Sequence, residues 1–175
     1  MLRKTLFYLL LLILLTGCID YDPQSLTIAI NPGVDTVEVN STFIDAGAKS
    51  TLGGENYSLT IIDNTVDITK VGTYIIIYEA TYKDVKVSAK RIINVIDETA
   101  PTITLKPGVD TILQYETWVD AGVNVSDNSN LDVLITKQGD VTNTAVGEYQ
   151  IVYIATDAYQ NQASVIRYVN VLALS

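Results

Sequence analysis

The side chains that most often carry catalysis are scarce in this chain. It has no histidine and a single cysteine, so the sequence excludes nucleophilic catalysis of the Ser-His-Asp and Cys-His kinds and disfavours most zinc sites. Twenty acidic residues remain as possible acid–base groups. A glycosidase needs two carboxylates at a set separation in a cleft, and no spacing distinguishes a pair such as Asp110 and Glu116, or Asp45 and Glu55. The sequence therefore predicts a protein that is not an enzyme.

Oxygen ligands for a cation are the second chemistry that these acids allow. In a β-sandwich, the loops after the second and penultimate strands lie at the end where the chain enters, so loop residues of the C-terminal half could approach the segment before it. Calcium takes six to eight oxygen ligands, and the alternative is that these residues only shape turns, which Asp and Asn favour. The predicted calcium ligands are Asp97, Glu98, Asp127, Asn128, Asp157 and Asn161, with Asp132 nearby.

The single cysteine, Cys18, follows a short apolar segment. Arg3 and Lys4 form a positively charged start, and an apolar run from Leu6 to Leu15 follows, too short for the roughly 20 residues of a membrane-spanning helix. Residues 15–18 read Leu-Thr-Gly-Cys, which resembles the bacterial lipobox. That resemblance implies a signal peptide over 1–17, cleavage before Cys18, a diacylglycerol on its sulfur and an acylated (palmitate-like) amino terminus. The alternative is an ordinary signal peptide with an incidental cysteine.

Composition limits the partners of the mature chain. Without residues 1–17 it has 158 residues, 9 basic and 20 acidic, and a net charge of −11. This charge argues against nucleic acid and against anionic lipid, and it fits a solvated extracytoplasmic protein or one that collects cations. With Cys18 lipidated no disulfide can form, so the core alone, or a metal, must stabilise the fold.

The sequence repeats itself at a fixed offset. Pro-Gly-Val-Asp-Thr at 32–36 recurs at 107–111, Asp-Ala-Gly at 45–47 recurs at 120–122, and Val-Gly-x-Tyr at 71–74 recurs at 146–149, all shifted by 75 residues. From Arg91 and Arg167 onward the shift is 76, which places one inserted residue in the last hairpin of the second copy. We therefore predict a tether over 18–23, a domain over 24–96, a linker over 97–101 and a second domain over 100–173.

Each copy has the composition of β-strands. Short runs rich in Val, Ile, Thr and Tyr alternate with Gly, Asn and Asp, and no helical period is sustained. Tyr149, Ile151, Tyr153 and Ala155 should face the core, and the Gly-x-Tyr that enters this strand resembles a tyrosine corner. We predict an all-β fold of two tandem sandwiches with seven strands each, in the second copy over 102–106, 111–115, 121–125, 133–136, 141–144, 148–157 and 163–172.

The second copy resembles a known family. Residues 97–105 (DETAPTITL), 118–122 (WVDAG), 146–153 (VGEYQIVY) and 155–157 (ATD) with Asn161 are similar to the bacterial Ig-like domain first noted in pesticidal crystal proteins, and to hyalin-type repeats. The resemblance implies an extracellular Ig-like module used in tandem as a spacer, stalk or adhesive element, without catalytic residues. The first copy departs from it, having Ser50–Gly54 where the second has Val125–Ser129 and Tyr82–Asp84 where the second has Asp157–Tyr159.

These observations predict a lipoprotein anchored in the cell membrane or outer membrane. Its expected role is to present Ig-like modules at the cell surface as a spacer or as an adhesion element that binds an envelope protein. The alternative is a carbohydrate-binding accessory protein of a polysaccharide system, because sugars stack on exposed aromatic rings and Trp118 could supply one. Phe43 is its counterpart in the first copy, which favours a packing role for both rings.

Overall fold

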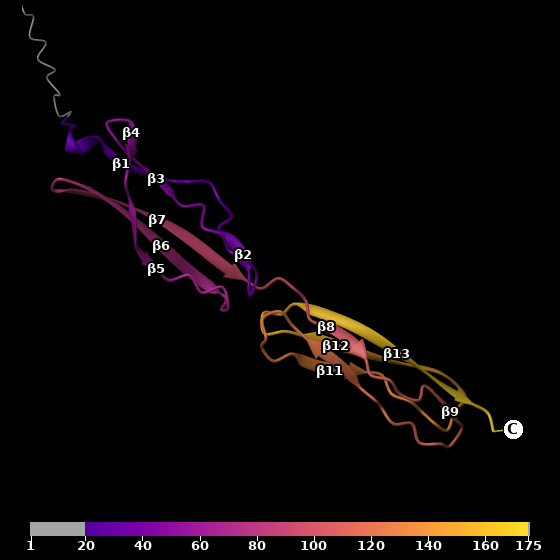
Figure 1. The fold of residues 1–175 in the computed structure, drawn as a ribbon. Coiled ribbons are helices and arrows are strands. Elements are labelled where there is room, and N and C mark those ends of the chain that lie inside the picture. Colours follow the sequence, from indigo (N-terminus) through magenta and orange to yellow (C-terminus); the bar gives the residue numbers. More distant parts are fainter. Residues whose placement is uncertain (1–19, 175) are drawn as a thin grey trace, which may run out of the picture.

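The computed structural model describes residues 20–174, and these form two β-domains that follow one another along a single long axis (Figure 1). The predicted signal peptide and Cys18 lie outside the described residues. The first domain holds a short 3-10 helix, η1 (Pro23–Ser25), and strands β1 (Leu26–Ile30), β2 (Thr36–Glu38), β3 (Ala48–Leu52), β4 (Glu55–Tyr57), β5 (Thr60–Asn64), β6 (Gly72–Tyr82) and β7 (Val85–Ile96). The second holds β8 (Thr102–Leu105), β9 (Thr111–Leu113), β10 (Val123–Ser126), β11 (Leu134–Gln138), β12 (Gly147–Thr156) and β13 (Gln162–Leu172).

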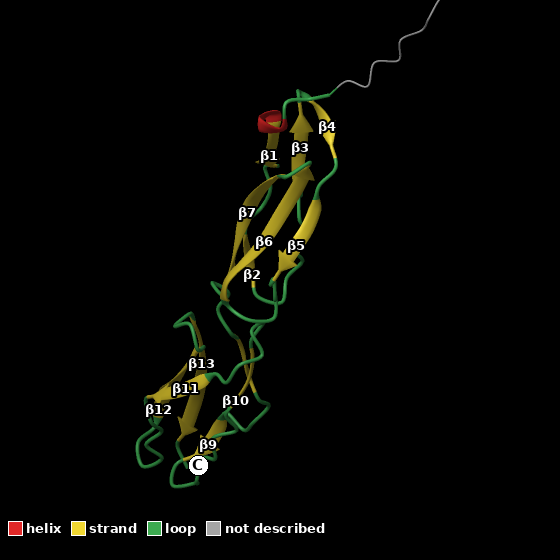
Figure 2. Cartoon of the chain, turned by 90° about the vertical axis from the view of Figure 1, so that its left-hand side faces the viewer, coloured by secondary structure: helices red, strands yellow, loops and turns green. Residues whose placement is uncertain are grey.

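Each domain is a sandwich of two sheets with matching topology (Figure 2). The strand orders are β1-β3-β4 and β2-β7-β6-β5 in the first domain, and β10-β8 and β11-β12-β13-β9 in the second. β2 pairs in parallel with β7, as β9 does with β13, while the long β6–β7 and β12–β13 pairs are antiparallel. The predicted all-β fold of two Ig-like sandwiches is confirmed.

One strand prediction is wrong. Residues 141–144 form no strand, which leaves six strands in the second domain; their counterpart in the first domain, residues 66–69, forms no strand either, and the seventh strand there is β4. The backbone groups of residues 141–144 bond instead to the loop after β9: the Asn143 carbonyl accepts from the Tyr115 N–H (2.8 Å), and the Thr144 carbonyl accepts from the Gln114 side chain (2.7 Å). The alternating sequence fitted a strand, but the loop contacts satisfy the same groups.

The predicted inward face of β12 is confirmed for three of its four residues. Ile151, Tyr153 and Ala155 are buried, as are their counterparts in the first domain, Ile76, Tyr78 and Ala80. Tyr149 is only half-buried because it lies near the start of the strand. Its hydroxyl donates to the Ala145 carbonyl at 2.9 Å, and Tyr74 makes the equivalent bond to Lys70 at 2.8 Å, which is the tyrosine-corner arrangement.

A buried arginine explains why the repeat motifs recur together. Arg167 is 1% exposed, and its guanidinium donates to Asp110 of the Pro-Gly-Val-Asp motif (2.6 Å), to the Gly122 carbonyl of Asp-Ala-Gly (3.3 Å) and to the Lys106 carbonyl (2.5 Å). Arg91, 2% exposed, bonds in the same way to Asp35 (2.5 Å) and to the Gly47 carbonyl (3.1 Å). Each arginine therefore connects the first two motifs of its copy.

The aspartate of Asp-Ala-Gly and the glycine of Pro-Gly complete this network. The Tyr153 hydroxyl donates to Asp120, and that of Tyr78 donates to Asp45 at 2.6 Å. A Cβ at Gly108 would lie 2.7 Å from the Cβ of Ala121, so the motif needs glycine for close approach. Asp45 and Asp110, which sequence reasoning considered as acid–base candidates, thus have structural partners.

The segment before β1 packs on the first domain. The Tyr21 ring packs against the cluster of Leu26, Leu52 and Ala80. Asp20 accepts a hydrogen bond from the Tyr82 hydroxyl (3.0 Å) and pairs with Lys83 (2.6 Å). Within the predicted tether over 18–23, Asp20 and Tyr21 therefore contact the first domain. Within 20–174 no helix is long and apolar enough to cross a membrane.

Candidate functional site

Glu38 lies at the junction between the two domains. It is the last residue of β2, and the parallel pairing with β7 sets it beside Ile96, where the chain leaves the first domain. Its carboxylate accepts hydrogen bonds from the linker N–H groups of Glu98 and Thr99, both at 3.1 Å, and from the Asn128 amide at 3.0 Å. One side chain therefore bonds the first domain to the linker and to a loop of the second domain.

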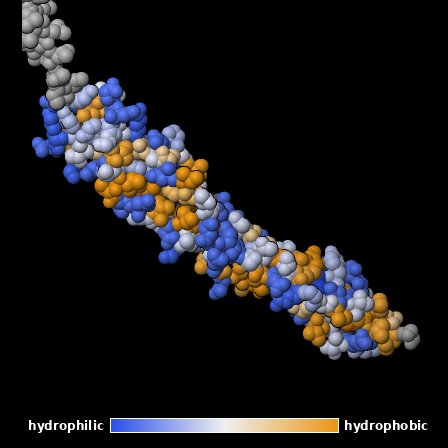
Figure 3. Space-filling view, in the orientation of Figure 1, coloured by the Kyte–Doolittle hydropathy of each residue, from blue (hydrophilic) through white to orange (hydrophobic). Residues whose placement is uncertain are grey.

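Further contacts close the junction. The Asn40 amide donates to the Asn128 carbonyl at 2.8 Å. A pocket of about 150 Å³ lies between the domains, lined on one side by Val39, Thr69, Lys70 and Val71 and on the other by Ser129, Leu131 and Tyr159. On the face drawn in Figure 3, hydrophilic residues gather near the middle of the long axis, where the domains meet.

Three carboxylates converge on the second-domain side of the junction. Asp97, Asp127 and Asp157 are each the first residue after a strand, namely β7, β10 and β12, and all three strands run toward the junction. One carboxylate oxygen from each lies within 4.8 Å of the others. Asp97 is 7% exposed and Asp157 is 4% exposed, so the cluster is shielded from solvent.

The loops satisfy one oxygen of each carboxylate and leave others free. Asp97 accepts from the Thr99 N–H (3.2 Å), Asp127 from the Ser129 N–H (2.9 Å), and Asp157 from the N–H groups of Tyr159 and Asn161 (2.8 and 2.9 Å). At the junction, three buried oxygens have no hydrogen-bond partner among the described residues: Asp97 Oδ2, Asp127 Oδ2 and Asn128 Oδ1. Buried polar atoms without partners are rare and costly, so these three require an explanation.

Acidic side chains crowd together at the junction. Over residues 20–174, none of the ion pairs involves Glu38, Asp97, Asp127 or Asp157. Burial raises the pKa of Asp97, and the charges of Asp127 and Asp157 raise it further. Burial also opposes the charge on Glu38, but hydrogen bonds from Thr99, Asn128 and the Glu98 N–H outweigh it and lower the Glu38 pKa.

The structure brings together only part of the predicted ligand set. Asp97, Asp127 and Asp157 meet, whereas Asn128, the next residue after Asp127, donates its amide to Glu38. Asn161 is a support, because its amide nitrogen donates to Asp157 (2.8 Å) and to the Asp97 carbonyl (3.1 Å). The side chains of Glu98 and Asp132 are exposed and are not members of the cluster.

Sequence reasoning missed Glu38, although the repeat carries a signal for it. The position 75 residues later is Leu113, so the two copies differ in polarity at the end of the same strand. Leu113 lies at the far end of the second domain and is 40% exposed, whereas Glu38 faces the linker. A departure from the repeat thus marks the junction.

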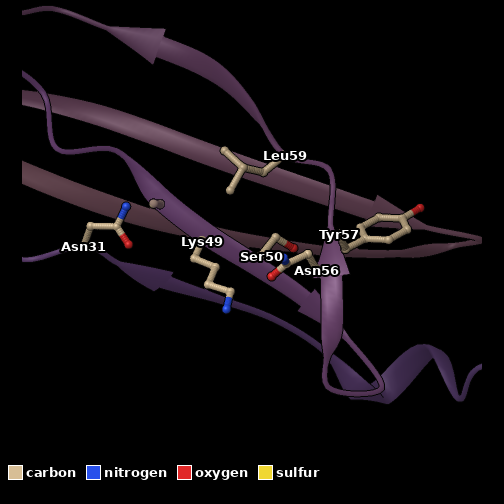
Figure 4. Close-up of a pocket in the computed structure, with 7 residues that line it drawn as sticks. Asn31, Lys49, Ser50, Asn56, Tyr57 and Leu59 are labelled. Atoms are coloured by element: carbon tan, nitrogen blue, oxygen red, sulfur yellow. The ribbon is translucent and has the colours of Figure 1, made fainter.

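Two other hollows lie away from the junction, one on each domain. One of about 450 Å³ lies on the first domain against β3 and β4, where Lys49, Ser50, Asn56 and Tyr57 surround it together with Asn31, Ala48 and Leu59 (Figure 4). None of its lining residues is an acid, so it offers no acid–base pair.

The other hollow lies beside Trp118. It has a volume of about 600 Å³, and apolar side chains including Val109, Ile112 and Val119 line it. The Trp118 ring is half-buried against the core cluster, and its Nε1 donates to the Val109 carbonyl at 3.0 Å. Phe43 likewise packs on the core of the first domain. The ring therefore packs on the core and also borders a surface hollow.

One family of known domains is similar to the second domain. Among curated proteins none matches the chain. Of the solved structures, a lipoprotein from Bacteroides thetaiotaomicron is similar at 16% identity and a TM-score of 0.38, over 81% of this chain and 98% of that one. Residues 103–171 match the family described as bacterial surface protein, Ig-like domain. The expected resemblance is confirmed at that level, and the second domain is thus similar to the Ig-like domains of bacterial surface proteins.

Proposed function

We propose that this protein is a lipid-anchored spacer that holds its second domain away from the membrane as an adhesive or protein-binding module. The observation that carries the proposal is the bonding at Glu38, which joins the end of one domain to the linker and to the next domain. A spacer needs a junction that resists bending, and these contacts supply one. Chemistry elsewhere is sparse, since the acids of the repeat motifs bond to buried arginine and tyrosine side chains.

The anchor in this proposal is Cys18, with Leu-Thr-Gly before it. Two or three acyl chains hold a protein on a membrane stably, whereas one does not. Because Asp20 already contacts the first domain, the lipidated position is only two residues before the folded part, with Ile19 alone between them. Such a segment spans at most about 7 Å, so the first domain stays next to the bilayer and the second domain makes the contacts.

Binding of a polysaccharide is a second candidate function, favoured by the hollow beside Trp118 in the outer half of the second domain. Aromatic rings that border an apolar hollow can stack on sugar rings. The half-buried position and the Nε1 bond of Trp118 favour packing, so this function ranks second.

Two experiments test these functions. Cys18→Ser should move the protein from the membrane fraction to the soluble fraction, and deletion of residues 24–96 should reduce access of antibodies to the second domain on whole cells. A membrane-bound Cys18→Ser variant, or unchanged access after the deletion, would contradict the anchored spacer. Glycan-array binding by the intact protein that is lost with Trp118→Ala would favour the polysaccharide function instead.

A further inference from the structure

We propose that the domain junction binds one calcium ion, held by Asp97, Asp127 and Asp157 with Asn128 beside them. This inference rests on the proposed spacer function, because the ion would fix the linker, through Asp97, to the second domain, through Asp127 and Asp157. It gives a role to a group of side chains that is otherwise costly to bury.

The unpartnered oxygens carry the inference. Asp97, which contributes a carboxylate oxygen to the cluster, is only 7% exposed, and its Oδ2 is buried without a hydrogen-bond donor among the described residues. Asp127 Oδ2 and Asn128 Oδ1 are also buried without a hydrogen-bond partner among the described residues. An acidic turn alone would leave such atoms facing water, so three of them at one place indicate a ligand that accepts lone pairs.

The charge of the site indicates a cation. Three aspartates have oxygens within 4.8 Å of one another, and none forms an ion pair with a described lysine or arginine. Isolated carboxylates are costly to bury, and a divalent ion at their centre turns mutual repulsion into attraction. Positions on opposite sides of one ion are about 4.8 Å apart when each bond is about 2.4 Å, which is within the calcium range.

The donor types favour calcium among divalent ions. Every candidate ligand is an oxygen, whereas zinc in proteins uses nitrogen and sulfur ligands in most sites, and the chain has no histidine. Magnesium keeps several waters and uses one or two carboxylates. Here three carboxylates converge in a shielded place, and the loops that carry them can supply amide or carbonyl ligands as well.

The entry end of the first domain provides an internal comparison. The positions that correspond to Asp127 and Asp157 are Leu52 and Tyr82, and both belong to the apolar cluster that Tyr21 covers. The same fold therefore closes one entry end with hydrophobic side chains and the other with carboxylates. A bound ion in the second domain would explain why carboxylates stand where the first domain has apolar side chains.

The test uses the soluble Cys18→Ser protein after treatment with a chelator. Calcium chloride is titrated by isothermal calorimetry, and melting is followed by the fluorescence of Trp118. We expect one site with a Kd on the order of 10⁻⁴–10⁻³ M, as in other extracellular modules, and a melting temperature that rises by roughly 10 °C at a hundredfold excess over Kd. Magnesium at the same concentration should give little heat.

Two matched variants make the result specific. Asp97→Asn should abolish the calcium response, while its melting temperature without calcium equals or exceeds that of the parent, because one of the crowded charges is gone. Glu98→Gln alters the neighbouring exposed acid and should bind calcium as the parent does. Absence of calcium heat in the parent, an equal response to magnesium, a response that persists in Asp97→Asn, or one lost in Glu98→Gln would overturn the site. Such a result leaves the spacer function standing, since the fractionation and antibody experiments test that separately.

Discussion

Replacement of Arg167 by methionine should strongly destabilise the second domain and leave the first one folded. Methionine fills a similar volume without the charge, so the variant removes the hydrogen bonds and keeps most of the packing. The lost bonds are those to Asp110 (2.6 Å) and to the carbonyls of Lys106 (2.5 Å) and Gly122 (3.3 Å).

The magnitude follows from what remains behind. Removing one partner of a buried ion pair costs about 3–5 kcal/mol. The Asp110 side chain is 42% exposed, so water can solvate it again, and the cost should lie near the lower end, about 3 kcal/mol. With an m-value of about 1–1.5 kcal/mol/M for a domain of this size, the urea midpoint falls by roughly 2–3 M.

Trp118 makes the measurement specific to one domain. It is the only tryptophan of the chain and lies in the second domain, so its emission reports unfolding of that domain alone. Arg91→Met is the matched control, because Arg91 makes the equivalent bonds in the first domain. Arg91→Met should lower the urea midpoint of the far-UV circular dichroism transition. The free energy of unfolding that Trp118 fluorescence reports should change by no more than about 0.5 kcal/mol.

A Trp118 midpoint for Arg167→Met within about 1 kcal/mol of the parent would refute the structural role of the buried arginine. An equal shift of that midpoint by both variants would refute the independence of the two cores. Either result would mean that the repeated motifs recur for another reason.

Three more changes test other parts of the fold. Burial and a bond to an aspartate raise the pKa of Tyr153 to about 12, against about 10 in an unfolded chain, so the stabilisation is complete below pH 10 and about 3 kcal/mol of it is lost between pH 10 and 12. The free energy of unfolding in urea should therefore fall less steeply with pH across this range for Tyr153→Phe than for the parent. An equally steep fall would contradict the burial of Tyr153. Gly108→Ala places a Cβ 2.7 Å from that of Ala121 and should cost about 1–3 kcal/mol, whereas Gly147→Ala, whose Cβ would lie 3.9 Å from the Tyr149 ring, should cost less when both are compared by urea unfolding. Tyr149→Ala should cost about 2 kcal/mol, less than the roughly 3 kcal/mol of a fully buried tyrosine, and an unchanged melting curve would show that the tyrosine corner is dispensable.

The repeat made most of the architecture predictable. A strand that alternates as Ile151, Tyr153 and Ala155 do can bury only one face, so its orientation follows from the sequence. The meeting of Asp97, Asp127 and Asp157 was also predictable, because each follows a strand that ends at the domain junction, β7 from the first domain and β10 and β12 from the second.

The remainder depended on contacts that no local pattern encodes. The bonds of Glu38 to the linker arise from the parallel pairing of β2 with β7, two strands far apart in sequence. The role of Arg167 requires two loops to converge on one side chain, and arginine in a strand usually predicts an exposed face. Packing of Tyr21 on the first domain likewise depends on an apolar hollow that forms only after folding.

The central claim is that the junction holds the two domains in one fixed arrangement. Spin labels at Lys90 and Ser164, both exposed and one in each domain, allow their separation to be measured by pulsed electron paramagnetic resonance in the Cys18→Ser background with millimolar calcium. A single narrow distance distribution that broadens with Glu38→Ala is the predicted result. A broad distribution in the parent, indistinguishable from that of Glu38→Ala, would contradict the claim.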